Sequence, residues 1–155
     1  MSMKTVIGNV YNALVAATAV GGTLEYVQRV GKGGKGDSPQ WEFPYVITGE
    51  VEKTVESLTI GPGGSDIIVY QVSVHFGTKN MDSSLAYYGD ATHKGILDLE
   101  EDLHQLFRGS MFDGAFSEPC AIIDSRTEFT RVQSGWLWGG VMRITGRKKE
   151  TRPRP

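Results

Sequence analysis

The sequence predicts an α+β domain, a mostly antiparallel four- to five-stranded sheet with two amphipathic helices packed on one face. Residues 67–76 alternate between a fully apolar set and a more polar set, as a half-buried strand does. Two other segments, 5–18 and 92–107, place apolar residues at helical spacing. The order helix, strands, helix, strands favours antiparallel pairing with both helices on one side of the sheet.

The first helical segment, residues 5–18, repeats apolar residues every three or four positions: Val6, Val10, Leu14 and Ala17. We expect Ser2 or Thr5 to cap its start and residues 21–22, both glycine, to end it. A secretory signal is disfavoured because polar residues interrupt the stretch, and no run reaches the ~20 apolar residues of a membrane span. Residues 23–30 are a short strand or an extended connection.

Residues 31–39 form a glycine-rich loop with two lysines. Gly31, Gly33 and Gly36 match the spacing of a dinucleotide-binding fingerprint, but no helix follows, as that site requires. A phosphate-binding P-loop is also excluded, because Lys35 is followed by glycine and not by serine or threonine. We interpret the segment as a surface loop. The alternative is an arm that becomes ordered against a partner.

A second strand is predicted over residues 41–48, with Pro44 at its start or on an edge, because proline cannot donate a ladder hydrogen bond. Residues 60–65 form a turn by composition, so this strand pairs antiparallel with residues 67–76. We place 67–76 at the centre of the sheet because of its apolar set: Ile68, Tyr70, Val72, Val74 and Phe76. The glutamates that follow the second strand are expected to face solvent: Glu50, Glu52 and Glu56.

The second helical segment, residues 92–107, has an apolar stripe: Ile96, Leu99, Leu103, Leu106 and Phe107. Asp82 or Asp90 is the expected cap, and Arg108 and Gly109 mark the end. The acidic residues of this segment do not converge on one point, because consecutive helical residues point around the axis. We interpret them as a solvated acidic face: Asp98, Glu100, Glu101 and Asp102.

The C-terminal third is predicted to complete the sheet. Residues 110–119 form a loop with three large apolar side chains, and residues 121–123 form a short strand. Residues 128–132 and 136–145 form a hairpin across 133–135.

We assign residues 1–146 to one domain and residues 147–155 to a basic tail that has no means of packing alone. The 155 residues are 39% hydrophobic and 22% charged, as in an ordinary soluble protein. The net charge of −2 gives no general attraction to nucleic acid or acidic membranes. The single Cys120 excludes an internal disulfide framework and is typical of a reducing compartment.

No residue pattern predicts an enzyme. His93 and His104 are about three helical turns apart, too far to share a metal, and we expect His75 to be exposed or hydrogen-bonded. Cys120 is interpreted as a small buried hydrophobe. We therefore predict no catalytic residue, no cofactor and no metal. We expect most of the aromatic residues near the strand and helix starts to pack in the core or on the sheet: Trp41, Trp136, Trp138, Tyr87 and Tyr88. The glycine-rich loops nevertheless favour an interaction role over catalysis, because such loops become ordered against neighbours.

The order of elements and two short motifs resemble the tail terminator (tail completion) proteins of long-tailed bacteriophages. One motif is Phe-Pro-Tyr-Val at residues 43–46, similar to a strand common in that family. The other is Trp-Leu-Trp-Gly-Gly-Val-Met-Arg-Ile at residues 136–144, similar to the family's final strand. The glycine–lysine loop and the basic tail have no counterpart in the resemblance.

The resemblance implies a structural virion subunit, made in the host cytoplasm, that forms a homohexameric ring on the head-proximal end of the tail tube. The ring would stop tube polymerisation and offer a joining surface to the head-side connector or stopper protein. Genomic DNA would pass through the lumen without sequence-specific binding. The implied partners are further copies of the chain, the tail tube protein and the connector.

As interface residues we single out members of the two glycine-rich segments and of the basic tail: Lys32, Gly33, Gly34, Lys35, Gly63, Gly64, Arg147, Lys148, Lys149 and Arg152. Two alternatives remain open from the sequence. One is another head–tail connector, a stopper or an adaptor. The other is a small ligand-binding α+β domain with its pocket between sheet and helices.

Overall fold

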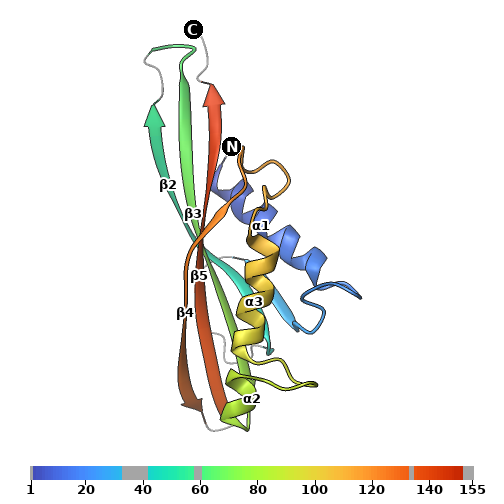
Figure 1. Ribbon diagram of the computed structural model, residues 1–155. Helices are drawn as coiled ribbons and strands as arrows, with labels where there is room; N and C mark the ends of the chain where they lie inside the picture. Colours follow the sequence, from blue (N-terminus) through green and yellow to red (C-terminus); the bar gives the residue numbers. More distant parts are fainter. Residues whose placement is uncertain (1, 33–41, 58–60, 133–134, 152–155) are drawn as a thin grey trace.

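In the computed structural model the protein is a five-stranded sheet with helices on one face (Figure 1). The structure describes residues 2–32, 42–57, 61–132 and 135–151. The elements are α1 (Met3–Ala17), β1 (Arg29–Lys32), β2 (Tyr45–Ser57), β3 (Ser65–Asn80), α2 (Ser83–Tyr87), α3 (Ile96–Phe107), β4 (Ala121–Val132) and β5 (Gly135–Thr151). The strand order is β1-β2-β3-β5-β4, and every pair except β1–β2 is antiparallel. The predicted α+β class is confirmed.

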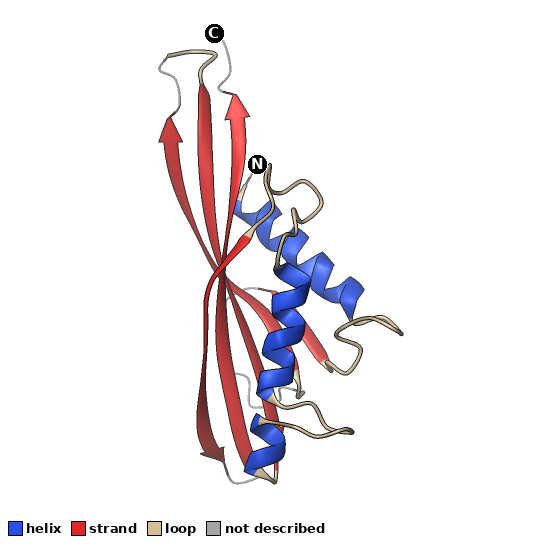
Figure 2. Cartoon of the chain, viewed as in Figure 1, coloured by secondary structure: helices blue, strands red, loops and turns tan. Residues whose placement is uncertain are grey.

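Strand β3 occupies the centre of the sheet, as its alternation predicts. The apolar set from Ile68 to Phe76 is buried on the side covered by the helices, whereas the intervening residues are half-buried on the other side. Figure 2 shows all three helices on this one side. Because each apolar residue on this face is removed from water by a helix or loop, β3 contributes the centre of the hydrophobic core.

The predicted helices are present, and their caps resolve two alternatives. Ser2 caps α1, since its hydroxyl accepts a hydrogen bond from the Thr5 N–H at 3.1 Å. Asp82 caps the short helix α2, which the sequence did not separate from α3. Helix α3 begins after Gly95, whose N–H donates to Asp98 at 3.0 Å, so neither predicted aspartate caps it.

We expected all four acidic residues of α3 to be solvated, and this prediction was wrong for three of them. The Asp98 carboxylate belongs to the start of the helix, as just described. The Asp102 carboxylate accepts a hydrogen bond from the Tyr26 hydroxyl at 2.6 Å. Burial is the main cause that raises the pKa of Tyr26 above its usual range, and this hydrogen bond is the second. The phenol therefore stays protonated and donates. Only Glu101 of the four is exposed.

The end of the sheet differs from the prediction in two respects. Residues 121–132 form one strand, because a bulge between Ile122 and Asp124 interrupts the alternation without ending the pairing with β5. The supposed tail is strand through Thr151, because residues 147–151 pair with 65–69 of β3. A polar segment that packs against no core can still form a strand when a neighbouring strand supplies partners for its backbone hydrogen bonds.

Three strands continue past the helices, so the molecule has two parts. We call residues 53–57, 61–70 and 146–151 the arm, and the remainder the body. The arm extends beyond the start of β4, which pairs no further than Thr145 of β5 (Figure 1). Strand β1 lies alongside β2 only over Tyr45–Thr48, so it does not reach the arm either.

Candidate interaction surface

The arm contains five of the predicted interface residues, two in the turn at its tip and three along β5. Gly63 and Gly64 lie in the turn between β2 and β3, where the Gly64 N–H donates to the Gly61 carbonyl at 3.1 Å. Gly61 and Gly63 have φ values of +92° and +74°, which glycine adopts most readily. Ser65, just after the turn, pairs with Thr151 at the end of β5. The turn and residues 147–149 therefore lie at the same end of the molecule (Figure 1).

The three basic residues of this end are held by local contacts. Arg147 Nη2 lies 3.6 Å from Glu56 Oε2 on β2. Lys148 Nζ donates to the Gly114 carbonyl at 3.0 Å, and the Lys149 N–H donates to Ser117 Oγ at 3.1 Å. The loop of residues 110–119 therefore ties the base of the arm to the body.

The other predicted interface residues do not join this group. Lys32 ends β1 opposite Thr48, and its Nζ lies 4.9 Å from the centre of the Tyr11 ring of α1. It is therefore a residue of the body. Gly33, Gly34, Lys35 and Arg152 lie outside the described residues.

The face of the sheet away from the helices has two charged stripes, and the exposure of the glutamates in one of them confirms the prediction. Glu50, Glu52 and Glu56 come from β2, whereas Arg143, Arg147 and Lys149 come from β5. Strand β3 separates the acidic stripe from the basic one, and its residues on this face from Ile67 to Ser73 are uncharged. On this face His75 Nε2 lies 3.3 Å from Glu50 Oε2, so the prediction of a hydrogen-bonded histidine is confirmed.

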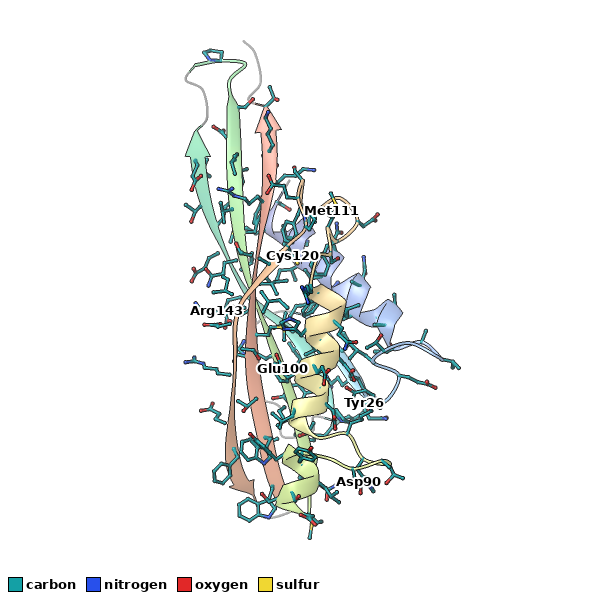
Figure 3. All side chains as sticks on the ribbon, in the orientation of Figure 1. Tyr26, Asp90, Glu100, Met111, Cys120 and Arg143 are labelled. Carbon is teal, nitrogen blue, oxygen red and sulfur yellow. The ribbon has the colours of Figure 1, made fainter. Side chains whose placement is uncertain are left out.

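Arg143 forms the most specific ion pair of this open face. Its Nε donates to Asp124 Oδ1 at 2.8 Å and its Nη2 contacts Oδ2, a bidentate arrangement. This hydrogen bonding lowers the pKa of Asp124 and raises that of Arg143. Both residues line a hollow of ≈ 210 Å³ together with Arg126 and Val141. Figure 3 shows Arg143 on the side of the sheet away from α3.

An aromatic cluster lies at the end of the body opposite the arm tip. The Trp138 ring centre is 4.3 Å from that of Tyr87 and 5.0 Å from that of Phe129, which is itself 6.0 Å from Trp136. The Trp138 Nε1 is buried without a hydrogen-bond partner among the described residues. Its members come from α2, β4 and β5, so the pairing of β4 with β5 and the packing of α2 bring them together.

Outside these surfaces, the described residues include one cysteine and several residues of types that can bind metals. Cys120 is buried, and its thiol donates to the Phe107 carbonyl at 2.8 Å. Burial raises the pKa of this thiol, which disfavours the reactive thiolate. The described histidines, cysteines and acidic residues nowhere gather in threes that could hold a metal ion. Within the same part of the chain, every helix is too short or too polar to cross a membrane.

Compared with known proteins, the chain matches no family model, and no curated protein matches it either.

Proposed function

We propose that the protein is a structural subunit of a phage tail, which assembles with further copies into a ring on the head-proximal end of the tail tube. In this role it ends tube polymerisation and offers a joining surface to the head-side connector, while DNA passes through the lumen. It acts by binding and not by catalysis, so no cofactor is required. Its place in the mature particle is the virion neck.

The observation that carries the proposal is the arm. Three strands extend beyond the helices that cover the body, and one side chain on them, Val55, is 53% exposed. A sheet that projects into solvent with open edges is a template for pairing with another chain. Such a projection favours an assembly subunit over a monomeric enzyme or binding domain.

The resemblance to terminator proteins adds to this support. Its first motif, residues 43–46, leads into β2, and its second, residues 136–144, lies within β5. Both motifs therefore belong to strands whose later residues, 53–57 of β2 and 146–151 of β5, form the arm. The space between helices and sheet is filled by apolar side chains of the core, which disfavours the alternative of a ligand pocket there.

The proposal is tested by disabling the reading frame in its source genome and imaging the particles by electron microscopy. We expect filled heads beside separate tails that are overlong or ragged at one end. Tails of normal length that fail to join heads would instead indicate a stopper or another connector. Normal infectious particles would refute the proposal. Complementation with the intact gene is the control.

A further inference from the structure

Several strand edges lack a neighbouring strand in the part of the chain that the structure describes, and two of them, on β4 and on β2, lie on opposite sides of the sheet. Strand β4 is the last strand on its side, so its outer edge is open over Ala121–Val132. On the other side, β1 covers β2 only as far as Thr48, so β2 is open over residues 51–57. Open edges of this length are ready to pair with another strand.

The directions of the strands permit these two edges to pair with each other between copies. Because β2–β3, β3–β5 and β5–β4 are all antiparallel, β2 and β5 run one way and β3 and β4 the other. When copies stand side by side in the same orientation, β4 of one therefore meets β2 of the next antiparallel. The alternation of strand direction is unbroken across the junction, and the contact is head-to-tail, as a cyclic ring requires.

Strand β1 limits the register of this pairing. An incoming β4 can occupy the open edge of β2 only above Thr48, where β1 ends. If Arg126 lies opposite Glu56, residues 125–131 of β4 fill residues 57–51 of β2, and the hairpin end of β4 stops beside the end of β1. Moving β4 two residues further along β2 towards β1 would make its last residues collide with Lys32.

Charge and polarity favour the same register. On the open face, Arg126 opposes Glu56, and Glu128 opposes the uncharged Thr54. On the helix face, Thr127 opposes Val55, and the exposed Phe129 opposes the aliphatic stem of Lys53. The register shifted by two residues towards β1 would place Asp124 opposite Glu56 and Glu128 opposite Glu52, and like charges directly opposed across strands are destabilising.

We propose that copies of this chain join through an antiparallel seam between β4 of one copy and residues 51–57 of β2 of the next, with Arg126 opposite Glu56. This inference rests on the proposed function and deepens it, because it names the surface through which copies would assemble into the ring. Within one copy Arg126 is level with Ile47, through Val141 and His75. Adjacent copies are therefore staggered along the strands, and a stagger is what closing a sheet into a ring requires.

The seam is tested by disulfide trapping with the double variant Thr127→Cys and Val55→Cys in the full chain. These positions are opposite each other on the same face in the proposed register. Within one copy they are separated by β3 and β5, so any disulfide between them joins two molecules. We expect mild oxidation to give a ladder of covalent oligomers that ends at the ring size, and reductant to abolish it.

Three controls accompany the trapping. The pair Glu128→Cys and Val55→Cys places the thiols on opposite faces and should lose the ladder. Mixing the two single variants, Thr127→Cys and Val55→Cys, should give covalent dimers and nothing larger, because each copy then has one reactive edge. The parent chain, whose Cys120 is buried, should give no cross-link.

The outcomes separate the seam from the proposed function. If native mass spectrometry finds oligomers of the parent chain but the matched pair does not cross-link, the seam is wrong and ring assembly stands. A parent that stays monomeric, with no cross-link at the highest soluble concentration, also overturns the seam. If the ladder forms but particles made without the protein are normal, the seam stands and the terminator role falls.

Discussion

The body and the arm place the same kind of strand in different surroundings. In the body, Val74 of β3 is fully buried between the sheet and the helices. In the arm, Val55 of β2 lies on the same face of the sheet, yet 53% of it is exposed, because it lies on the outer strand beside Ile68, the last core residue of β3 in this direction. The difference teaches that the cover over a strand, from the helices and the loop of residues 110–119, decides which part of the sheet stabilises the fold and which part remains available to a partner.

The junction between the two parts is made by the loop of residues 110–119. Phe116 packs on Tyr70 and over Gly146, and Phe112 packs on Phe107 and Phe116. Closer to the tip of the arm than Gly146, the Lys148 side chain donates to the Gly114 carbonyl of the loop. Apolar packing therefore gives way to polar contacts within a few residues along β5.

The largest expected difference between the parts is in stability. We predict that Val74→Ala lowers the free energy of unfolding by about 2–3 kcal/mol, through lost burial and a residual cavity. The same substitution at Val55 should change it by no more than about 0.5 kcal/mol, because the site is largely solvated. Urea unfolding followed by circular dichroism measures both. Equal losses would contradict the distinction between body and arm.

A smaller effect is expected at the junction. A Cβ on Gly146 would collide with the Phe116 ring, whereas one on Gly139 of the same strand meets no atom within 4 Å. We predict that Gly146→Ala destabilises by about 1–3 kcal/mol, as overpacking does. Gly139→Ala should be neutral or slightly stabilising. Thermal unfolding of the two variants compares them, and a neutral Gly146→Ala would show that the loop yields without cost.

The smallest effect is expected at the periphery of the body, in the loop between α2 and α3. The Asp90 carboxylate accepts hydrogen bonds from the Thr92 and His93 N–H groups, both at 2.8 Å, and these lower its pKa to about 2. Since the folded pKa lies below the unfolded value of about 4, the stabilisation is present above pH ~4 and is lost as the pH falls towards 2.

Asp90→Asn removes this titration. We predict that the melting temperature of the parent falls more than that of the variant between pH 5 and pH ~2.5, the interval given by the two pKa values. An NMR titration of the Asp90 carboxyl group checks the pKa directly. Identical acid profiles for parent and variant would mean that the loop hydrogen bonds do not contribute to folding.

Local patterns were sufficient to predict much of the body. The alternation in β3, the helical spacing in α1 and α3, and the hydroxyl of Ser2 at a helix start each act over a few residues. These features depend on which side chains recur at the period of a strand or a helix. The burial of Cys120 and the position of Pro44 just before β2 were predicted from residue type, because cysteine behaves as a small hydrophobe and proline cannot donate a ladder hydrogen bond.

The candidate surface was predicted only in part. Gly63, Gly64 and the basic residues 147–149 were chosen for composition, and the structure places them together because β3 pairs with β5. Lys32 was chosen on the same grounds and lies in the body, because β1 pairs parallel with β2 near Thr48. Composition identifies residues suited to a surface, but it does not say which of them share it.

The sequence by itself determined the class of fold, the central strand and the two main helices, because apolar periodicity commits a segment to bury one face. The tertiary structure alone decided that residues 147–151 are strand, that β4 is continuous through its bulge, and that three strands extend beyond the helices. Those outcomes depend on backbone hydrogen bonds between segments distant in the chain, and such bonds leave no pattern in the side chains of either segment.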